Sequence, residues 1–240
     1  MKTSFEKSGF DKIKADAYIF LCYEDKELLE IEFKKIQRLL KTKLSEISHE
    51  DFKGKEGQAQ LFYTNKHRII LCGLGKKENM KLEKLRIAVN TVIKKAKSLK
   101  IKKIAIEILN DESVPEGFEE IASAETVGCI LGNYYFGKYY TQKEKKEGSV
   151  IKEVVFFADK HLTEKSSKEL EKGVKTGTII GNATNLARDL GNEPSNFLYP
   201  ESYCDLIVER SASKKYTTEV LNLEDIQKLV VQDDFDQLKA

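Results

Sequence analysis

One short stretch, NATNLARDLGNEPSNFLYPESY from Asn182 to Tyr203, brings together several side chains able to do acid–base or anion-binding chemistry. The chain has only three prolines, and one of them, Pro194, lies in the middle of five polar side chains: Arg188, Asp189, Asn192, Glu193 and Asn196. Arginine binds carboxylates and phosphates, and carboxylates bind metals or move protons. The same residue types also satisfy backbone groups at a sharp turn. The stretch is therefore either a catalytic site or a joint between two bodies of the protein.

The order of residues in this stretch favours a joint. We expect Arg188 and Asp189 to close a long helix, with Gly191 at the C′ position, because glycine adopts the left-handed conformation without strain. Pro194 prevents the helix from resuming, and Pro200 suits the first position of a new helix. Three polar side chains can satisfy the loose backbone groups of the turn between the helices: Asn192, Glu193 and Asn196.

Other patterns that carry chemistry are incomplete. The segment Leu71–Lys77 follows a strand and has two glycines, but it lacks the third glycine of a dinucleotide-binding loop and the spacing of a P-loop, so we interpret it as a strand-to-helix turn. Neither an H-E-x-x-H nor a G-x-S-x-G run occurs. The four cysteines form no C-x-x-C pair, which favours buried, reduced thiols over disulfides or zinc ligation: Cys22, Cys72, Cys129 and Cys204. We predict no catalytic residue and no metal ligand in this chain.

Composition limits the classes of partner. Lys and Arg total 41 against 39 Asp and Glu, so the overall field gives no general attraction to nucleic acid. Five of the basic residues are arginines, so most of the positive charge is lysine. The N-terminal residues contain no apolar run of signal-peptide type, and no window of about 18 apolar residues occurs. We therefore expect a cytoplasmic protein with neither a membrane nor a nucleic-acid partner.

Hydrophobic patterns predict an α/β fold, with a mixed sheet flanked by helices. Strands are expected over Ala17–Tyr23, Gln58–Thr64, His67–Cys72, Lys103–Leu109 and Val150–Ala158. Asn65-Lys66 is a plausible hairpin turn, which predicts one antiparallel pair. A helix is expected after Asp25, with four apolar residues on one stripe: Leu29, Phe33, Ile36 and Leu40. A second helix is expected after Asn79, which can cap it. Two more are expected over Phe118–Tyr139 and from Thr163 to about Leu190. Alternating strands and helices with one hairpin are typical of a mixed sheet.

The longest predicted helix contains Gly173, Gly177 and Gly181. A glycine inside a helix costs roughly 1 kcal/mol relative to alanine, so three of them on one stripe need a reason. Steps of four residues advance about 40° around the helix, which keeps all three glycines on one narrow face. We predict that this face meets a neighbouring helix or sheet at short range, with a weak surface helix as the alternative.

The segment Asn185–Asn196 (NLARDLGNEPSN), followed by Pro200-Glu201, resembles the A-R-D-L-x-N-E-P-x-N…T-P-E segment of the leucyl (cytosol) aminopeptidase family. Four weaker matches to the family's N-terminal domain occur upstream in the same order: residues 52–58, 73–76, 83–86 and 131–139. Two departures are Tyr199 in place of a capping threonine and Gly191 in place of an apolar residue. The likeness covers most of residues 1–229.

The resemblance implies a macro-domain-like α/β N-terminal domain over residues 1–160. It also implies a connecting helix over 161–191 and the start of a peptidase catalytic domain over 192–240. In the family, two divalent metals, zinc or manganese, activate a water that attacks the peptide carbonyl. The family's ligands lie in later segments, among them an N-T-D-A-E-G-R-L-like run that this sequence does not contain. The resemblance also implies a homo-oligomer.

Three hypotheses follow from this resemblance. The first is a non-catalytic N-terminal portion of a leucyl-aminopeptidase-like protein, inactive alone because it lacks the metal ligands. The second is a stand-alone macro-like binding or assembly module that holds a nucleotide, self-associates, or pairs with a full-length family member. The third is a truncated gene product without function.

Overall fold

A computed structural model describes residues 1–7, 12–41, 51–64, 67–109, 114–158, 162–212 and 217–232. The chain divides into two compact units, Met1–Asp189 and Leu190–Ala240, which are described separately. The first unit holds β1 (Lys2–Glu6), β2 (Ala17–Tyr23), α1 (Lys26–Leu40), β3 (Ala59–Tyr63), β4 (Arg68–Gly75), the 3-10 turn η2 (Lys77–Asn79), α2 (Leu82–Ser98), β5 (Lys103–Glu107), α3 (Phe118–Gly132), α4 (Lys143–Glu147), β6 (Glu153–Phe157) and most of α5 (Glu164–Asn192). The second holds α6 (Pro200–Ala212) and α7 (Leu223–Gln232).

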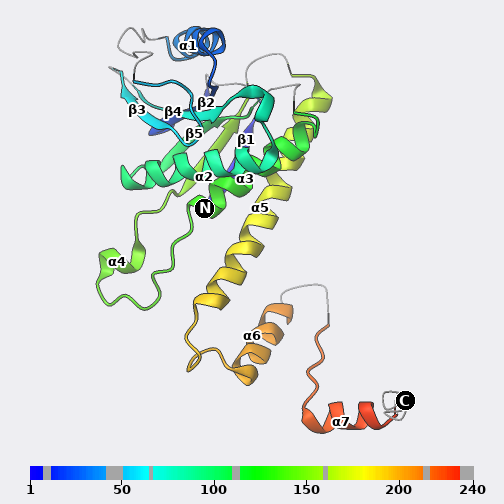
Figure 1. Cartoon of the computed structure of the whole chain (residues 1–240). Helices are drawn as coiled ribbons and strands as arrows, with labels where there is room; N and C mark the ends of the chain where they lie inside the picture. The colour runs from blue at the N-terminus through cyan, green and yellow to red at the C-terminus, as the bar shows by residue number, and fades with distance from the viewer. Residues whose placement is uncertain are drawn as a thin grey trace. The chain divides into compact units, whose positions relative to one another are not determined.

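The described strands form one six-stranded sheet in the order β1-β6-β5-β2-β4-β3 (Figure 1). All neighbouring strands are parallel except β3 and β4, which are antiparallel. The predicted mixed sheet and hairpin are therefore confirmed, while the hairpin turn at Asn65-Lys66 lies outside the described residues. Strand β1 was not predicted, because Lys2, Thr3 and Ser4 give it no apolar pattern; its pairing with β6 decides its conformation.

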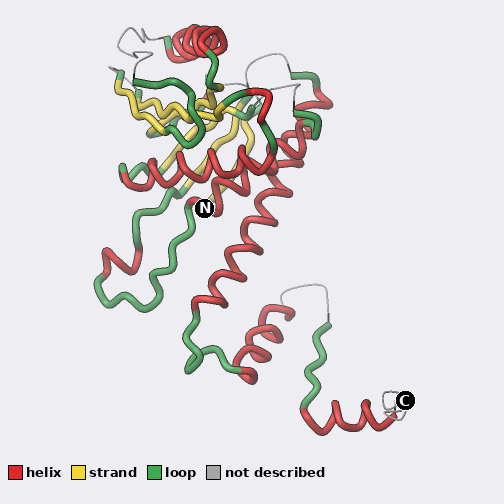
Figure 2. Tube along the Cα trace, viewed as in Figure 1, coloured by secondary structure: helices red, strands yellow, loops and turns green. Residues whose placement is uncertain are grey.

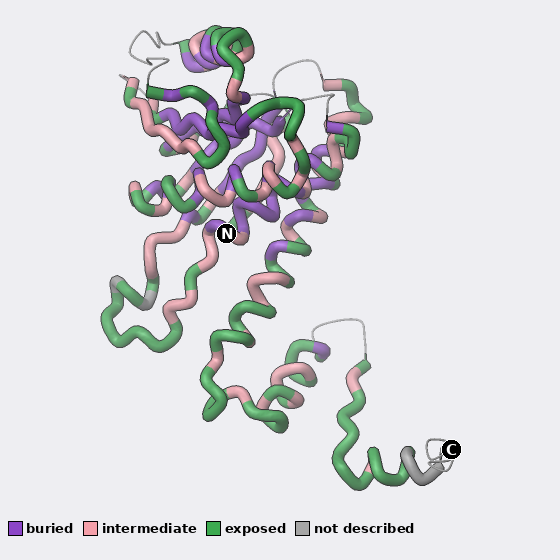
Figure 3. Tube along the Cα trace, viewed as in Figure 1, coloured by how far each residue is buried: buried purple, intermediate pink, exposed green. Residues whose placement is uncertain are grey.

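Helices cover both faces of the sheet (Figures 1 and 2). Helix α1 covers one face with the predicted stripe of Leu29, Phe33, Ile36 and Leu40, all of which are buried. Asp25 caps this helix, since its Oδ1 accepts from Leu28 N at 2.9 Å. Helices α2 and α3 lie together on the opposite face, where the larger apolar cluster also takes in Leu170 and Val174 of α5. Figure 3 shows the resulting buried interior along the sheet and the inner helix faces.

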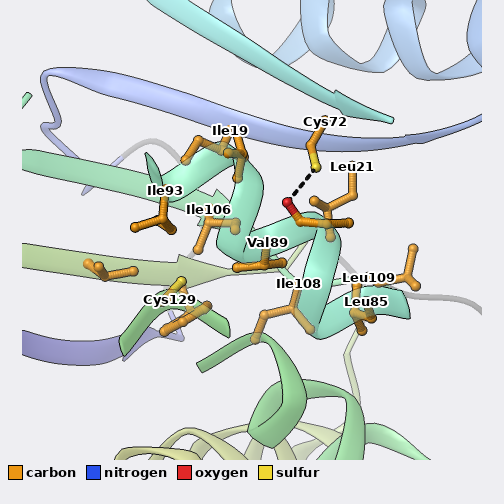
Figure 4. Packing of buried hydrophobic residues seen from close by; sticks show 14 of the residues in the cluster. Ile19, Leu21, Cys72, Leu85, Val89, Ile93, Ile106, Ile108, Leu109 and Cys129 are labelled. Carbon is orange, nitrogen blue, oxygen red and sulfur yellow. Dashed lines mark hydrogen bonds between the residues drawn. The ribbon is translucent and has the colours of Figure 1, made fainter. Parts of the chain in front are cut away.

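The core between the sheet and α2 contains free thiols among branched aliphatic side chains (Figure 4). Cys72 on β4 donates to the carbonyl oxygen of Ala88 on α2, at 3.3 Å between Sγ and O. Burial raises the pKa of Cys72 to about 12, and it raises the pKa of Cys129 and Cys22 as well. These thiols are protonated at neutral pH and pack as small apolar groups, as the sequence predicts.

One acid is sealed in the same core. Glu125, on the sheet-facing side of α3, has no solvent exposure. Its Oε1 accepts from the backbone N–H of Leu109 at 2.8 Å, and its Oε2 has no hydrogen-bond partner among the described residues. Burial raises the pKa of Glu125 well above its ordinary value, the bond from Leu109 offsets this in part, and the carboxylate of Glu107 adds to the rise. The buried environment therefore favours the neutral carboxylic acid form of Glu125 in the folded protein.

Several element boundaries differ from the sequence predictions. Asn79 does not cap α2: it ends the 3-10 turn, and Lys81 occupies the N-cap without a side-chain hydrogen bond. Helix α3 ends at Gly132 instead of Tyr139, because the chain leaves the helix at Asn133 for an irregular segment. The predicted strand over Val150–Ala158 is reduced to Glu153–Phe157, the length that its two neighbouring strands pair with.

The second unit has almost no interior of its own. Its large apolar side chains are exposed or only partly buried, with Phe197 at 56% and Leu223 at 70%, and Ser211 is its one buried residue among those described. Helix α7 begins with a capping box, since Asn222 Oδ1 accepts from Asp225 N at 3.0 Å and Asp225 Oδ2 accepts from Asn222 N at 3.2 Å. None of the helices in the described part of the chain is long and apolar enough to cross a membrane.

Candidate functional site

The glycines of α5 meet α3 at backbone distance. A Cβ atom on Gly173 would lie 2.3 Å from the carbonyl oxygen of Glu119, and one on Gly177 would lie 2.5 Å from that of Ser123. A Cβ on Gly181 would lie 2.8 Å from the Ile130 side chain. No side chain fits at these distances, so the glycine face lets two helices approach more closely than any other residue would allow.

On the C-terminal side of these glycines, polar side chains form hydrogen bonds with the free carbonyl groups at the end of α3. The last four carbonyls of a helix have no partner within the helix. Here Asn185 Nδ2 donates to Ile130 O at 3.2 Å, Arg188 donates to Leu131 O at 3.4 Å, and Lys97 Nζ donates to Gly132 O at 3.4 Å. Two of these donors carry positive charge, which also complements the negative end of the helix. The asparagine and arginine of the Asn185–Asn196 segment therefore cap α3 from a different helix.

Tyr134, two residues after α3, completes the contact with α5. Its hydroxyl donates to Asp189 Oδ1 at 2.9 Å, and the Arg188 guanidinium lies 5.5 Å from the centre of its ring. The distance suits a cation–π interaction. Arg188 and Asp189 thus bind the same tyrosine, one through the ring and one through the hydroxyl. This cluster, which we call the joint, consists of Asn185, Arg188 and Asp189 on α5 with Tyr134 and the end of α3.

Hydrogen bonds hold the two ends of the segment from Tyr134 to Val150 close together. Asn133 donates from Nδ2 to Ile151 O at 2.9 Å and accepts from Ile151 N at 2.8 Å. Lys97 Nζ donates to Tyr134 O at 2.9 Å, and Ser149 Oγ donates to Lys97 O at 2.8 Å. Partial burial lowers the pKa of Lys97, and the charge of Lys94 lowers it further. Tyr134 is therefore held from both sides, by α2 and by α5.

Gly191 does not have the predicted role. Helix α5 continues through it to Asn192, Gly191 is absent from the residues with positive φ, and an added Cβ would meet nothing within 4 Å. The C′ prediction is wrong because glycine permits the left-handed conformation without imposing it, so the helix runs through Gly191 to Asn192, two residues before Pro194.

The polar residues after the helix lie in a turn of the second unit. Backbone bonds form this turn, from Glu193 N to Leu190 O and from both Phe197 N and Leu198 N to Pro194 O. Asn192 and Asn196 are exposed. Helix α6 begins at Pro200, where the sequence places it. Ser202 Oγ accepts from Tyr199 N at 2.9 Å, which satisfies the backbone N–H of the residue before the helix and is one half of a capping box.

A second cluster of charged groups lies where α1 crosses the sheet. Lys35 Nζ lies 2.7 Å from Glu32 Oε1 and 2.7 Å from Glu107 Oε2. Burial alone lowers the pKa of Lys35, but the two carboxylates raise it above its ordinary value, so the lysine stays charged. A lysine fixed between two carboxylates ties α1 to β5 and is neither a base nor a nucleophile.

Other residues of the chain fill the space beside the two glycines at the end of β4. A Cβ on Gly73 would lie 2.1 Å from the carbonyl oxygen of Lys55, and Gly75, with φ of 75°, faces Glu56. Gly75 N donates to Gly54 O at 2.9 Å. The segment 52–58 therefore covers this strand end, and a 3-10 turn and α2 follow it, as expected for a strand-to-helix turn.

The described residues do not fit a dinuclear metal centre. Within the described ranges, no group of three or more His, Cys, Asp or Glu side chains is placed to hold a metal ion. The buried carboxylates already have other roles: Glu107 pairs with Lys35, and Glu125 is a neutral acid that accepts a backbone N–H. No step of metal chemistry can be derived from this part of the chain.

Sequence reasoning identified half of the joint. Arg188 and Asp189 were found from their position at a helix end, whereas the groups that they bind were not: Tyr134 and the carbonyl of Leu131. The one signal for Tyr134 was its place in the family-like segment Leu131–Tyr139. Capping of one helix by another has no local sequence pattern, because the partners are about 55 residues apart.

Replacing Tyr134 with phenylalanine tests the joint. The substitution keeps the ring under Arg188 and removes the hydroxyl bond to Asp189, which is worth about 0.5–1.5 kcal/mol. We expect amide exchange of residues 186–190 to become about two- to tenfold faster. Tyr140→Phe is the matched control, since Tyr140 is half exposed on the same segment. Unchanged exchange in Tyr134→Phe, measured by mass spectrometry, contradicts the role given to the hydroxyl.

Comparisons with known proteins agree with this architecture. A family model described as the cytosol aminopeptidase family, N-terminal domain, matches residues 19–143. The probable cytosol aminopeptidase of Sulfurihydrogenibium sp. is 29% identical over 234 residues, which cover 95% of this chain and 45% of the relative. That of Alkaliphilus oremlandii is 31% identical over 235 residues, which cover 95% of this chain and 46% of the relative. The chain thus spans a little under half the length of these curated relatives.

Solved structures show the same fold. A mutant of tomato leucine aminopeptidase superposes with a TM-score of 0.74 at 18% identity, covering 95% of this chain and 46% of that one. The bottromycin maturation enzyme BotP in complex with Mn gives a TM-score of 0.61 at 21% identity, covering 83% of this chain and 37% of that one. The family model covers more than half of the 240 residues, from within β2 to the start of α4. The chain belongs to the cytosol aminopeptidase family.

Proposed function

We propose that these 240 residues act as the non-catalytic N-terminal portion of a cytosol aminopeptidase, with a macro-like domain over 1–160, a connecting helix over 161–191 and the start of the catalytic domain from 192. The observation that carries the proposal is the match of residues 19–143 to the N-terminal domain of the family. The alignment to relatives of about twice this length supports it. Helix α5, fixed to α3 by its glycines and by the joint, is the element that connects the two parts.

The proposed contribution of this portion is to hold the connecting helix α5 firmly against α3. A helix held at backbone distance over Gly173, Gly177 and Gly181, and capped onto α3 by Asn185 and Arg188, leaves the first unit in a fixed direction. Whatever follows Asp189 starts from a defined point. In the family, the two divalent metals supply an activated water for peptide hydrolysis, and their ligands come from later segments. We propose that the 240 residues alone do not hydrolyse peptides.

The activity of the purified chain tests this proposal. We expect no release of leucine from leucyl amide above background, with either zinc or manganese added. The full-length A. oremlandii relative, assayed in parallel under the same conditions, is the positive control. Metal-dependent hydrolysis that stays with the 240-residue protein through purification, and that is lost on adding a chelator, contradicts the proposal.

The nucleotide-binding alternative is disfavoured by one observation. The glycines that would have to approach a phosphate, Gly73 and Gly75, contact Lys55 and Glu56 instead. In an assembly role, the exposed surfaces would bind a further copy of the chain or a full-length family member. We propose a cytoplasmic location for this role. We propose assembly over nucleotide binding for any independent role of this portion.

A further inference from the structure

The two edges of the described sheet are protected differently. Strand β1 lies at one edge and β3 at the other (Figure 1). An uncovered edge strand presents free N–H and C=O groups, and proteins block such edges with charged side chains, proline, bulges or a covering element. Strand β1 carries Lys2 and Glu6, and the hydroxyl of its Thr3 lies 2.8 Å from that of Thr178 on α5. This edge is therefore charged and in contact with a helix.

Strand β3 lacks the protection that β1 has. Its five residues, A-Q-L-F-Y, include no charged side chain and no proline, and its pairing with β4 contains no register shift. Among the described strands, β4 alone pairs with it. Tyr63 is 65% exposed, and the other four residues are of intermediate exposure. Leu61 packs against the larger apolar cluster and Phe62 against the smaller one, so β3 is apolar on both faces of the sheet.

The free backbone groups of β3 alternate along the strand. Gly73 N donates to Gln58 O at 2.7 Å, and Thr64 N donates to His67 O at 2.9 Å, so the even-numbered residues bond to β4. The N–H and C=O groups that point away from β4 belong to the odd-numbered residues: Ala59, Leu61 and Tyr63. No backbone hydrogen bond reaches these outward groups from any described residue. Donors and acceptors at every second residue are the pattern that one further strand requires.

Positive charge lies at the ends of this open edge. Three exposed cations that form no ion pair with a described residue precede β3 or follow it: Lys53, Lys55 and Arg68. Arg68 is the register partner of Tyr63. Of the acids in the segment before β3, Glu56 pairs with Lys84 at 2.9 Å, which leaves Asp51. The net positive charge favours acidic residues at the ends of any chain that extends this edge.

We propose that β3 is a strand-addition site, which takes an extended segment of another polypeptide as a further strand of the sheet. The segment has apolar, β-branched residues beside the five residues of β3, because both faces next to Leu61 and Phe62 are apolar, and it has acidic residues at its ends. A second copy of β3 is a poorer occupant, since it brings the same cations to the edge. This inference does not depend on the proposed function, because it rests only on the edge of the sheet.

A peptide with blocked ends, E-V-T-V-T-V-E, tests the site on the full 240-residue chain. We expect a dissociation constant below about 1 mM. In nuclear magnetic resonance spectra, the amide protons of Ala59, Leu61 and Tyr63 should move downfield as they enter hydrogen bonds. Those of Gln60 and Phe62 should move less, because their N–H groups already bond to β4. No binding at peptide concentrations up to about 5 mM, or binding that leaves the amides of β3 unmoved, overturns the proposal.

Two altered peptides separate the contributions of backbone and charge. Methylation of the five central nitrogens removes the donors from both edges of the peptide, so binding should be lost. The peptide K-V-T-V-T-V-K keeps the backbone and reverses the charge, so it should bind at least about threefold more weakly at low salt. Undiminished binding of the methylated peptide contradicts strand addition. Equal binding of the lysine peptide contradicts the acidic character of the partner.

Substitutions of Tyr63 test the same site from the side of the chain. Tyr63→Pro removes one outward N–H and keeps the ladder with β4, because an edge strand tolerates proline where its N–H faces solvent. We expect it to weaken binding of E-V-T-V-T-V-E at least about tenfold. Tyr63→Thr keeps the N–H and is the matched control, which should bind within about threefold of the parent. Equal loss in both variants contradicts a backbone site. A dimer of the parent chain that Tyr63→Pro abolishes, measured by sedimentation equilibrium, assigns the edge to a second copy and also overturns the proposal.

Discussion

Replacing Gly177 with alanine is expected to lower the free energy of unfolding by about 2 kcal/mol, although alanine is the better helix former. The new Cβ would lie 2.5 Å from Ser123 O and 2.7 Å from the Cβ of Thr126. The first of these is a backbone atom, so relief requires a shift of α5 against α3. Overpacking of this kind costs roughly 1–3 kcal/mol or more, and the gain in helix propensity returns about 1 kcal/mol of it. The midpoint of thermal unfolding should fall by about 4–8 °C, as measured by circular dichroism.

Gly191→Ala is the matched control for this prediction. Both glycines lie in α5, but an added Cβ at Gly191 meets nothing within 4 Å. With no clash, the change in propensity alone acts, so we expect no loss of stability and a gain of at most about 1 kcal/mol in helix α5. If the two substitutions have the same effect on the thermal midpoint, the short distance between α5 and α3 is not the reason for the glycines.

Replacing Glu125 with glutamine is expected to stabilise the protein at pH 7. Glu125 is fully buried and its pKa is raised, chiefly by burial, so the folded state holds it in the neutral form. The unfolded chain ionises the same group above about pH 4.3, and folding must then take up a proton. Glutamine is neutral in both states and keeps an oxygen that can accept from Leu109 N. The substitution therefore removes the cost of proton uptake and preserves the one hydrogen bond.

The effect has a definite pH dependence. Because the folded-state pKa is raised, the stability contributed by the protonated acid is fully present below the unfolded-state pKa and is lost as pH rises towards the folded-state pKa. The glutamine variant and the parent protein should therefore be equally stable near pH 4. Above that pH, their difference should grow by up to about 1.4 kcal/mol per pH unit until the folded-state pKa is reached. Urea unfolding between pH 4 and pH 7.5 measures the difference directly.

Glu120→Gln provides the control for this titration. Glu120 lies on the same helix and is exposed, so its substitution should change stability little and without the same slope in pH. A Glu125→Gln variant that is less stable than the parent at pH 7 contradicts the neutral state of the acid.

Local pattern in the sequence predicted those elements whose conformation depends on their own periodicity. The stripe of Leu29, Phe33, Ile36 and Leu40 fixed which side of α1 is buried, and the apolar run Ala17–Tyr23 gave the bounds of β2. The antiparallel pair β3 and β4 followed from two strands a short turn apart. The glycine spacing in α5 indicated a face for close approach. Neighbouring residues carry all of these signals.

Only the tertiary structure showed the elements in which contacts between distant residues override the local conformational preference of the sequence. Strand β1 exists because β6 supplies its hydrogen bonds. Helix α5 runs through Gly191, and the turns before it bind Ile130, Leu131 and Tyr134, about 55 residues earlier. The sequence placed Arg188 and Asp189 at a helix end and assigned them no partner, because a carbonyl at the end of another helix has no mark in the sequence. The sequence therefore determined the family, the mixed sheet and the glycine face. Only the folded chain showed that the polar residues before the turn bind α5 to α3, because that contact exists only once both helices have formed.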